Sequence, residues 1–322
     1  MLDIYIEKAF LDDFYLSYDE ITASNAQKIL YQILVNYPET RWFIDCRIDS
    51  IEDLEILKQE NPFFAYKAVS YPPHPIDSIK DSIDADVLGK SILVLTKDRE
   101  TWHKELEMKG ALCLSSDNYE LEIQKLIERY HYKIDLSDGY FEWKKLKVLS
   151  VFNRIVINDN YILTDKSNQK IDQNLAPLLK QLICDFKQQV QVEIFSKDFG
   201  ALPPGNYDQV KQAVSERIKK LNRVFANYDI RFKIINNALP IPDFVFHDRV
   251  LLTNFQSIDC GVGFNLFADK NGGVKKSNSQ IISETIFDLY TYKRIKNLRK
   301  MHQNYLNRIS GQGYSSIQFT FI

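Results

Sequence analysis

The sequence has no long apolar run. None of its 322 residues belong to a stretch approaching the roughly 18 uninterrupted apolar residues that a membrane-spanning helix needs. Acidic residues interrupt the first apolar run, at Asp3, Glu7, Asp12 and Asp13, which argues against a secretory signal peptide. We therefore expect a soluble protein that does not insert into a membrane.

Cysteine is scarce and unpatterned. The four cysteines, Cys46, Cys113, Cys184 and Cys260, lack C-x-x-C spacing, and the first three lie beside apolar residues. Such residues are typical of buried free thiols in a reducing compartment, so we expect a cytoplasmic protein. His74 and His103 have no companions at ligand spacing, so no zinc site is predicted.

The chain also lacks a strong net charge. Its 41 basic and 43 acidic residues give a formal charge of −2, so any nucleic-acid binding must come from local basic patches. The length and the 45% hydrophobic content are sufficient for two domains, each with its own core.

Residues 1–145 alternate short apolar strands with amphipathic segments, which predicts an α/β domain with an open, mostly parallel sheet. The prolines of Tyr71 to Pro75 predict a loop. The expected strands are 2–6, 42–46, 91–96 and 111–114, and the expected helices are 23–36, 51–60, 101–109 and 119–130.

Residues 146–322 are predicted to form a second α/β domain. The expected strands are 154–157, 190–195, 230–235, 245–254 and 263–267, and the expected helices are 174–187, 207–227 and 281–309.

One motif in this second part carries a chemical signal. His247 and Arg249, then Asn254, then Gly261 to Asn265, read H-x-R-x4-N-x6-G-x-G-F-N. On a strand, His247 and Arg249 would share one face, where both can meet one phosphate. The motif resembles the phospholipase D signature H-x-K-x4-D-x6-G-S-x-N.

The resemblance implies candidate catalytic residues His247, Arg249, Asn254 and Asn265. The family uses a histidine nucleophile, a cation for the phosphate and an acid that orients the imidazole. Here the acid is the amide of Asn254, which cannot stabilise an imidazolium as a carboxylate does, so phosphate binding is favoured over turnover. Residues 154–164 also resemble the opening of the phospholipase D-like domains at the C-terminus of MIT-domain proteins, which are binding modules. This resemblance implies a mixed sheet flanked by helices.

A second candidate surface is a basic helix near the C-terminus. Its cations stand among Tyr290, Tyr292 and Tyr305, a composition that can follow a nucleic-acid backbone and stack bases, although the same helix can also pack as ordinary core. The candidate nucleic-acid-binding residues are Lys293, Arg294, Lys296, Arg299 and Lys300.

Acidic residues stand where strands of the first domain end, at Glu7, Asp45 and Asp98, with Asp86 nearby in sequence. The segments around them resemble PIN-type nucleases, in which clustered carboxylates hold a divalent metal that activates water. The resemblance implies a Mg²⁺ or Mn²⁺ site on these four residues, although the family prefers aspartate where Glu7 stands. Helix capping or a solvated surface would explain such acids equally well.

Three functions therefore remain open for a nucleic-acid-directed protein. The first is a metal-dependent nuclease with its centre in the first domain. The second uses His247 as the nucleophile in a homodimer, since one copy of the motif needs a second for leaving-group protonation. The third is a noncatalytic binding or scaffold subunit of a larger assembly, by analogy with prokaryotic antiviral defence systems built from degenerate nuclease parts.

Overall fold

The computed structural model describes residues 2–68, 72–83, 89–164, 169–183, 189–197, 207–236, 249–267, 274, 278–311 and 318–321. The chain divides into two compact units. Unit 1 comprises Met1–Arg129 with Thr285–Lys296, and unit 2 comprises Tyr130–Glu284 with Asn297–Ile322. The predicted boundary at 145/146 thus falls inside unit 2, and a segment expected in the second domain belongs to unit 1. None of the helices in these ranges is long and apolar enough to span a membrane.

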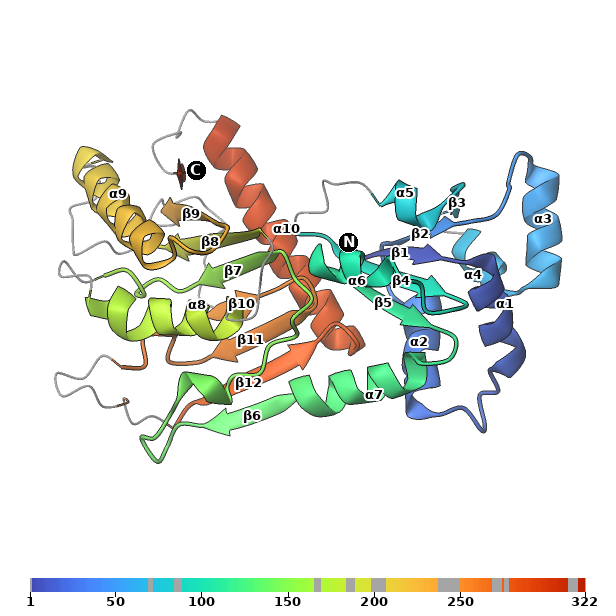
Figure 1. Ribbon diagram of the computed structural model, residues 1–322, viewed down its shortest axis with the longest axis horizontal. Helices are drawn as coiled ribbons and strands as arrows, with labels where there is room; N and C mark the ends of the chain where they lie inside the picture. The colour runs from blue at the N-terminus through green and yellow to red at the C-terminus, as the bar shows by residue number, and fades with distance from the viewer. Residues whose placement is uncertain are drawn as a thin grey trace. The chain divides into compact units, whose positions relative to one another are not determined.

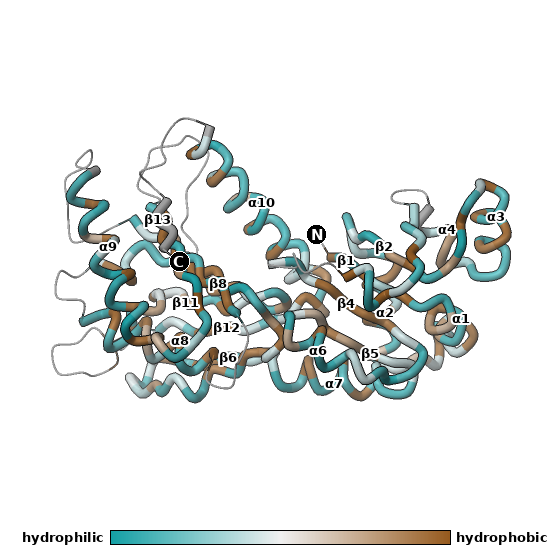
Figure 2. Tube along the Cα trace, turned by 45° about the horizontal axis from the view of Figure 1, so that its top comes forward, coloured by the Kyte–Doolittle hydropathy of each residue, from teal (hydrophilic) through white to brown (hydrophobic). Residues whose placement is uncertain are grey.

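The sheet of unit 1 has five parallel strands in the order β3-β2-β1-β4-β5 (Figure 1). Their bounds are Leu2–Ile6 for β1, Thr40–Ile44 for β2, His74–Pro75 for β3, Ser91–Thr96 for β4 and Ala111–Ser115 for β5. Strands β1, β4 and β5 are buried along their whole length, as in a parallel sheet covered on both faces. Figure 2 shows hydrophobic residues concentrated along β1 and β4. The predicted α/β fold with an open parallel sheet is confirmed.

Seven helices of unit 1 lie between and after these strands in the described ranges. They are α1 (Lys8–Ser17), α2 (Asn25–Val35), α3 (Ile51–Glu60), α4 (Phe63–Ala68), α5 (Ile79–Ser82), α6 (His103–Met108) and α7 (Tyr119–Tyr130). Capping boxes start α2, through Ser24 and Gln27, and α3, through Ser50 and Asp53. The proline segment was predicted as loop throughout, but His74 and Pro75 pair with β2 at the sheet edge, where proline is tolerated.

The sheet of unit 2 is mixed, with the order β13-β9-β8-β7-β10-β11-β12-β6. Strands β7 (Arg154–Asn158), β8 (Val190–Ser196) and β9 (Ile230–Asn236) run parallel. Antiparallel pairs join β10 (Val250–Leu252) to β7 and to β11 (Gln256–Cys260), β12 (Gln280–Thr285) to β6 (Tyr132–Asp135), and β13 (Gln318–Phe321) to β9. The predicted second α/β architecture, a mixed sheet with flanking helices, is confirmed.

Helices cover both faces of the unit 2 sheet. A 3₁₀ turn, η1 (Trp143–Lys145), precedes β7, and a π-helical turn, η2 (Ile171–Leu175), leads into α8 (Ala176–Ile183). Helix α9 (Tyr207–Val224) joins β8 to β9. Side chains alternate along β8: Ile194 joins the core with α8 and α9, whereas Phe195 contacts Tyr305 of α10 (Leu289–Gly311). Figure 1 shows α8 in front of the strands and the later part of α10 behind them.

Three predicted elements of the second part differ from the structure. The segment 263–267 was expected as a strand but forms a loop after β11. The helix expected from residue 281 begins only at Leu289, because Gln280–Thr285 alternates between buried and more exposed positions and forms β12. Of the strand expected at 245–254, residues 250–252 form β10, and residues 241–248 lie outside the described ranges.

The cysteines in the described ranges carry free thiols, as predicted. Cys113 and Cys260 are buried and Cys46 is half-buried, whereas Cys184 lies outside the described residues.

Candidate functional site

Part of the motif lies at one edge of the unit 2 sheet, where β7 and β8 end. Asp159 directly follows β7, and Lys197 directly follows β8. Strand β10 runs antiparallel to β7 and pairs Val250 with Asn158, so Arg249 stands at this same edge. His247, two residues earlier, lies outside the described residues.

Arg249 and Lys197 converge on one aromatic ring. The Arg249 Cζ atom lies 5.7 Å from the centroid of the Tyr161 ring, and the Lys197 Nζ atom lies 5.8 Å from the same centroid. Arg249 Nη1 donates a hydrogen bond of 2.5 Å to the Gly261 carbonyl, which fixes the direction of the guanidinium. Tyr161 is 41% exposed, and the Lys197 side chain is exposed. The edge thus presents two cations and an accessible ring to solvent.

Asp159 ties together the two loops of this site. It is buried, and its Oδ1 accepts the Tyr161 N–H at 2.9 Å while its Oδ2 accepts the Phe264 N–H at 2.7 Å. Burial raises the pKa of Asp159, whereas the two N–H bonds and the charges of Arg249 and Lys170 act to lower it. The carboxyl group therefore acts as a structural acceptor between the loops.

Both glycines of the motif are closely packed, and the backbone at Gly263 requires glycine. Gly263 has φ +83°, and a Cβ atom there would lie 2.6 Å from Asp159 Oδ2 and 3.1 Å from Arg249 Cδ. At Gly261 a Cβ atom would lie 2.4 Å from the Ser279 Oγ. The G-x-G spacing thus lets this loop lie against Asp159 and Arg249.

Asn265 supports the same site from inside the fold. It is buried, its Oδ1 accepts a hydrogen bond of 3.0 Å from Asn174 Nδ2, and its Nδ2 donates to the Tyr161 carbonyl at 3.5 Å. Of the candidate catalytic residues, Arg249 and Asn265 are therefore brought together around Tyr161.

Asn254 lies at the other end of β10. Its Oδ1 accepts the backbone N–H groups of Asn153 and Arg154, both at 3.3 Å, and its Nδ2 donates to Asn153 Oδ1 at 3.0 Å. Arg154 opens β7, whereas Arg249 stands where β7 ends, so the length of the strand separates Asn254 from Arg249. The spacing from Arg249 to Asn254, which suggested that both belong to one site, instead places them at opposite ends of β10.

Two of the predicted nucleic-acid-binding residues of the basic helix α10 contact other parts of the fold. Lys296 Nζ lies 3.3 Å from Glu39 Oε1, and Arg299 Nη2 donates to the carbonyls of Thr253 and Asn254 at 2.6 and 2.9 Å. Lys293 and Lys300 are exposed, and Arg294 is half-buried.

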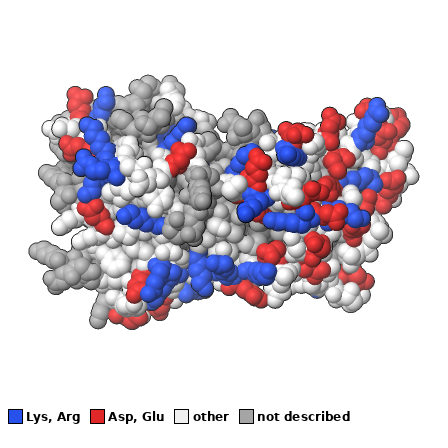
Figure 3. Space-filling view, viewed as in Figure 1, with Lys and Arg blue, Asp and Glu red and all other residues white. Residues whose placement is uncertain are grey.

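The tyrosines of α10 divide in the same way. Tyr292 and Tyr305 are buried and donate to the carbonyls of Pro38 and Asn236, whereas Tyr290 is 73% exposed. Figure 3 shows runs of basic side chains as well as acidic clusters on the visible surface. Helix α10 is thus largely a packing helix.

Three of the predicted acids of unit 1, Glu7, Asp45 and Asp98, lie near the point where the strand order reverses, between β1 and β4, a common ligand position in α/β sheets. Glu7 Oε2 accepts the Lys97 N–H at 2.6 Å, and Asp45 Oδ1 accepts the Lys8 N–H at 2.6 Å. Burial raises the pKa of Glu7, and the charges of Asp45, Glu100 and Asp98 raise it further, against the hydrogen bond from Lys97. Sequence reasoning missed Glu100.

These acids do not form a ready metal site. Among the described residues, no group of three or more histidine, cysteine, aspartate or glutamate side chains is arranged to hold a metal ion. Glu7 and Asp45 each direct one oxygen to a backbone N–H, and Asp86 lies outside the described residues. The Mg²⁺ or Mn²⁺ site on Glu7, Asp45, Asp86 and Asp98 therefore stays a prediction.

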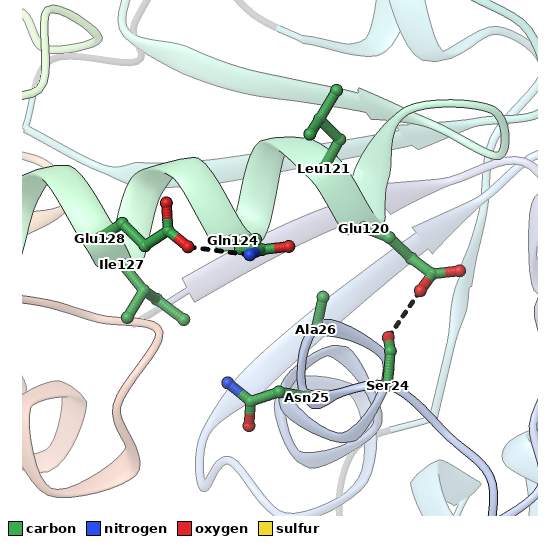
Figure 4. Close-up of a pocket in the computed structure, with 8 residues that line it drawn as sticks. All are labelled: Ser24, Asn25, Ala26, Glu120, Leu121, Gln124, Ile127 and Glu128. Carbon is green, nitrogen blue, oxygen red and sulfur yellow. Dashed lines mark hydrogen bonds between the residues drawn. The ribbon is translucent and has the colours of Figure 1, made fainter.

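In the part of unit 1 that the structure describes, a cleft and a cavity occur that no sequence pattern indicated. A polar cleft of about 560 Å³ beside the acids is lined by residues 45–49 and 75–77. A second cavity, of about 440 Å³, lies between the start of α2 and α7 (Figure 4). There Ser24 donates to Glu120 at 2.6 Å, and Gln124 donates to Glu128 at 2.8 Å.

The chain matches no protein-family model, and a search of curated proteins finds no match. The resemblances to phospholipase D and to PIN-type nucleases therefore depend on the quoted residues alone.

Proposed function

We propose that the protein binds phosphate-bearing nucleic acid at the edge of the unit 2 sheet. The observation that supports this function best is the convergence of Arg249 and Lys197, from separate strands, on Tyr161. Arginine offers a planar fork of donors that matches phosphate oxygens, and lysine adds a mobile charge. The Gly261 carbonyl occupies one side of the guanidinium and leaves further N–H donors for a ligand.

The local charge balance also favours an anionic ligand. Asp159 is buried, and its oxygens are engaged by the N–H groups of Tyr161 and Phe264, so it faces the protein rather than the solvent. Lys197 is exposed, so its ammonium can move onto an incoming phosphate.

Fluorescence anisotropy with a labelled oligonucleotide tests this function. Lys197→Ala and Arg249→Ala should each weaken binding roughly tenfold, because a charge-assisted hydrogen bond is lost. Each should also lower the slope of log affinity against log salt by about one. Lys219→Ala is the matched control, because Lys219 is an exposed lysine on α9 of the same unit. Equal binding by all four proteins would refute the proposal.

Metal-dependent phosphodiester hydrolysis in unit 1 is a second candidate. It is favoured by the crowding of Asp45, Asp98 and Glu100 around Glu7, because a divalent cation would relieve their mutual repulsion. Since the described acids do not form a ligand set, we assign no catalytic step to them.

The hydrolytic candidate predicts RNA or DNA cleavage that requires Mg²⁺ or Mn²⁺. Asp98→Asn should abolish cleavage and also remove any metal-induced rise in Tm, whereas Glu52→Gln, an exposed change on α3, should affect neither. Absence of cleavage, with salt-sensitive binding retained, would identify the protein as a noncatalytic binding or scaffold subunit.

A further inference from the structure

We infer that the unit 2 site takes single-stranded nucleic acid, with one unpaired base stacked on Tyr161 and the adjoining phosphate held by Arg249 and Lys197. This inference rests on the proposed function and adds to it the class of nucleic acid. It assigns Tyr161 as the residue that distinguishes a single strand from a duplex.

The Tyr161 ring is an accessible platform on a fixed backbone. Its side chain is 41% exposed, while its N–H bonds to buried Asp159 at 2.9 Å. Its carbonyl accepts from Thr164 Oγ1 at 3.1 Å and from Asn265 Nδ2 at 3.5 Å. Because the turn is already ordered, stacking a base on the ring does not cost the entropy of ordering the backbone of Tyr161.

Both cations lie over the ring on which a base would stack. Both are 5.7 to 5.8 Å from the ring centroid, near the limit of about 6 Å for a cation–π attraction, so the ring holds them only weakly. A nucleotide places its phosphate one sugar away from its base. A base that stacks on the ring would take the place of a cation held there, and its phosphate would lie within reach of Arg249 and Lys197.

A duplex cannot make the same contact. Its base faces are covered by neighbouring base pairs, so an aromatic side chain can stack only on a base that has left the helix, as in single strands, loops and ends. A duplex can reach Arg249 and Lys197 through its backbone alone, so it should bind more weakly than a single strand of the same sequence.

The test compares one oligonucleotide with its blunt duplex, using the full chain. Wild type should bind the single strand more tightly. Tyr161→Leu should lower single-strand affinity about tenfold and duplex affinity much less, because base–aromatic stacking is lost. Tyr161→Phe keeps the ring and should bind like wild type. Circular dichroism and thermal melting verify that each variant is folded.

The outcomes separate this inference from the proposed function. If single strand and duplex bind equally, and Tyr161→Leu changes neither while Arg249→Ala weakens both, the stacking role is overturned and phosphate binding stands. If Tyr161→Phe loses as much affinity as Tyr161→Leu, the hydroxyl acts rather than the ring, and the inference is again overturned. If wild type binds neither ligand, the proposed function fails and the inference falls with it.

Discussion

Replacing Gly263 with alanine should destabilise unit 2 and weaken nucleic-acid binding together. The backbone at Gly263 has φ +83°, which costs a non-glycine residue about 1–2 kcal/mol. The new Cβ atom would lie 2.6 Å from Asp159 Oδ2, so the carboxyl group or the loop must move. That movement breaks the 2.7 Å hydrogen bond from the Phe264 N–H, a bond to a buried carboxyl group worth about 1.5–3 kcal/mol. The two effects sum to roughly 2.5–5 kcal/mol if they add.

Urea unfolding of the full chain measures this loss, and anisotropy measures binding. Gly139→Ala is the matched control, because Gly139 also has a positive φ, +74°, but lies in the turn between β6 and η1. It should show the backbone cost alone. If Gly263→Ala is no more destabilising than Gly139→Ala, the contact with Asp159 does not require glycine at position 263.

Three further predictions concern residues that the sequence singled out. Asn254→Asp restores the acid of the phospholipase D signature but sets a carboxylate oxygen against Asn153 Oδ1, so it should cost about 1–3 kcal/mol in urea unfolding and bring no phosphodiesterase activity. Lys296→Ala removes the ion pair with Glu39 and should lower the unfolding free energy by about 1 kcal/mol, with oligonucleotide affinity unchanged. The raised pKa of Glu7 means that the folded state binds a proton more readily than the unfolded chain does, so charging Glu7 lowers stability as pH rises above 4.5. Glu7→Gln should therefore be more stable than wild type at neutral pH, a difference that should vanish in melts below pH 4.5.

Most of the sheet of unit 1 could be predicted because β1, β4 and β5 are largely apolar runs between amphipathic helices, whereas the edge strand β3 was predicted as loop. In unit 2 the same reasoning missed β11, whose residues are buried although several are polar. Gln256 bonds the Leu149 N–H, the Lys147 carbonyl and Ser283 Oγ, so its burial depends on partners far away in the chain. A local hydrophobic pattern cannot predict partners that are distant in the sequence.

The candidate site could be predicted only in part for a similar reason. The motif contains Arg249 and Asn265, which were predicted as site residues. Asp159 and Tyr161 lie in the segment 154–164 that resembles the opening of phospholipase D-like domains, but they were not predicted as site residues. Lys197 follows β8, far from the motif in sequence, and joins the site through the parallel pairing of β7 with β8. The sequence also does not show that Lys296 pairs with Glu39 or that Arg299 bonds the Thr253 carbonyl. Helix α10 was therefore predicted as a binding surface, although these side chains are engaged within the fold.

The division of α10 between the units has a consequence for synthesis on the ribosome. Tyr292 stacks on Tyr37 at 4.6 Å and donates to the Pro38 carbonyl, and Tyr37 in turn donates to the Ile286 carbonyl. Unit 1 therefore lacks part of its packing until Thr285–Lys296 has emerged, after most of unit 2 has been made. The usual order, in which an N-terminal domain folds to completion first, is not available to this chain. A fragment that ends near residue 145 should accordingly be less stable than the same residues in the whole protein.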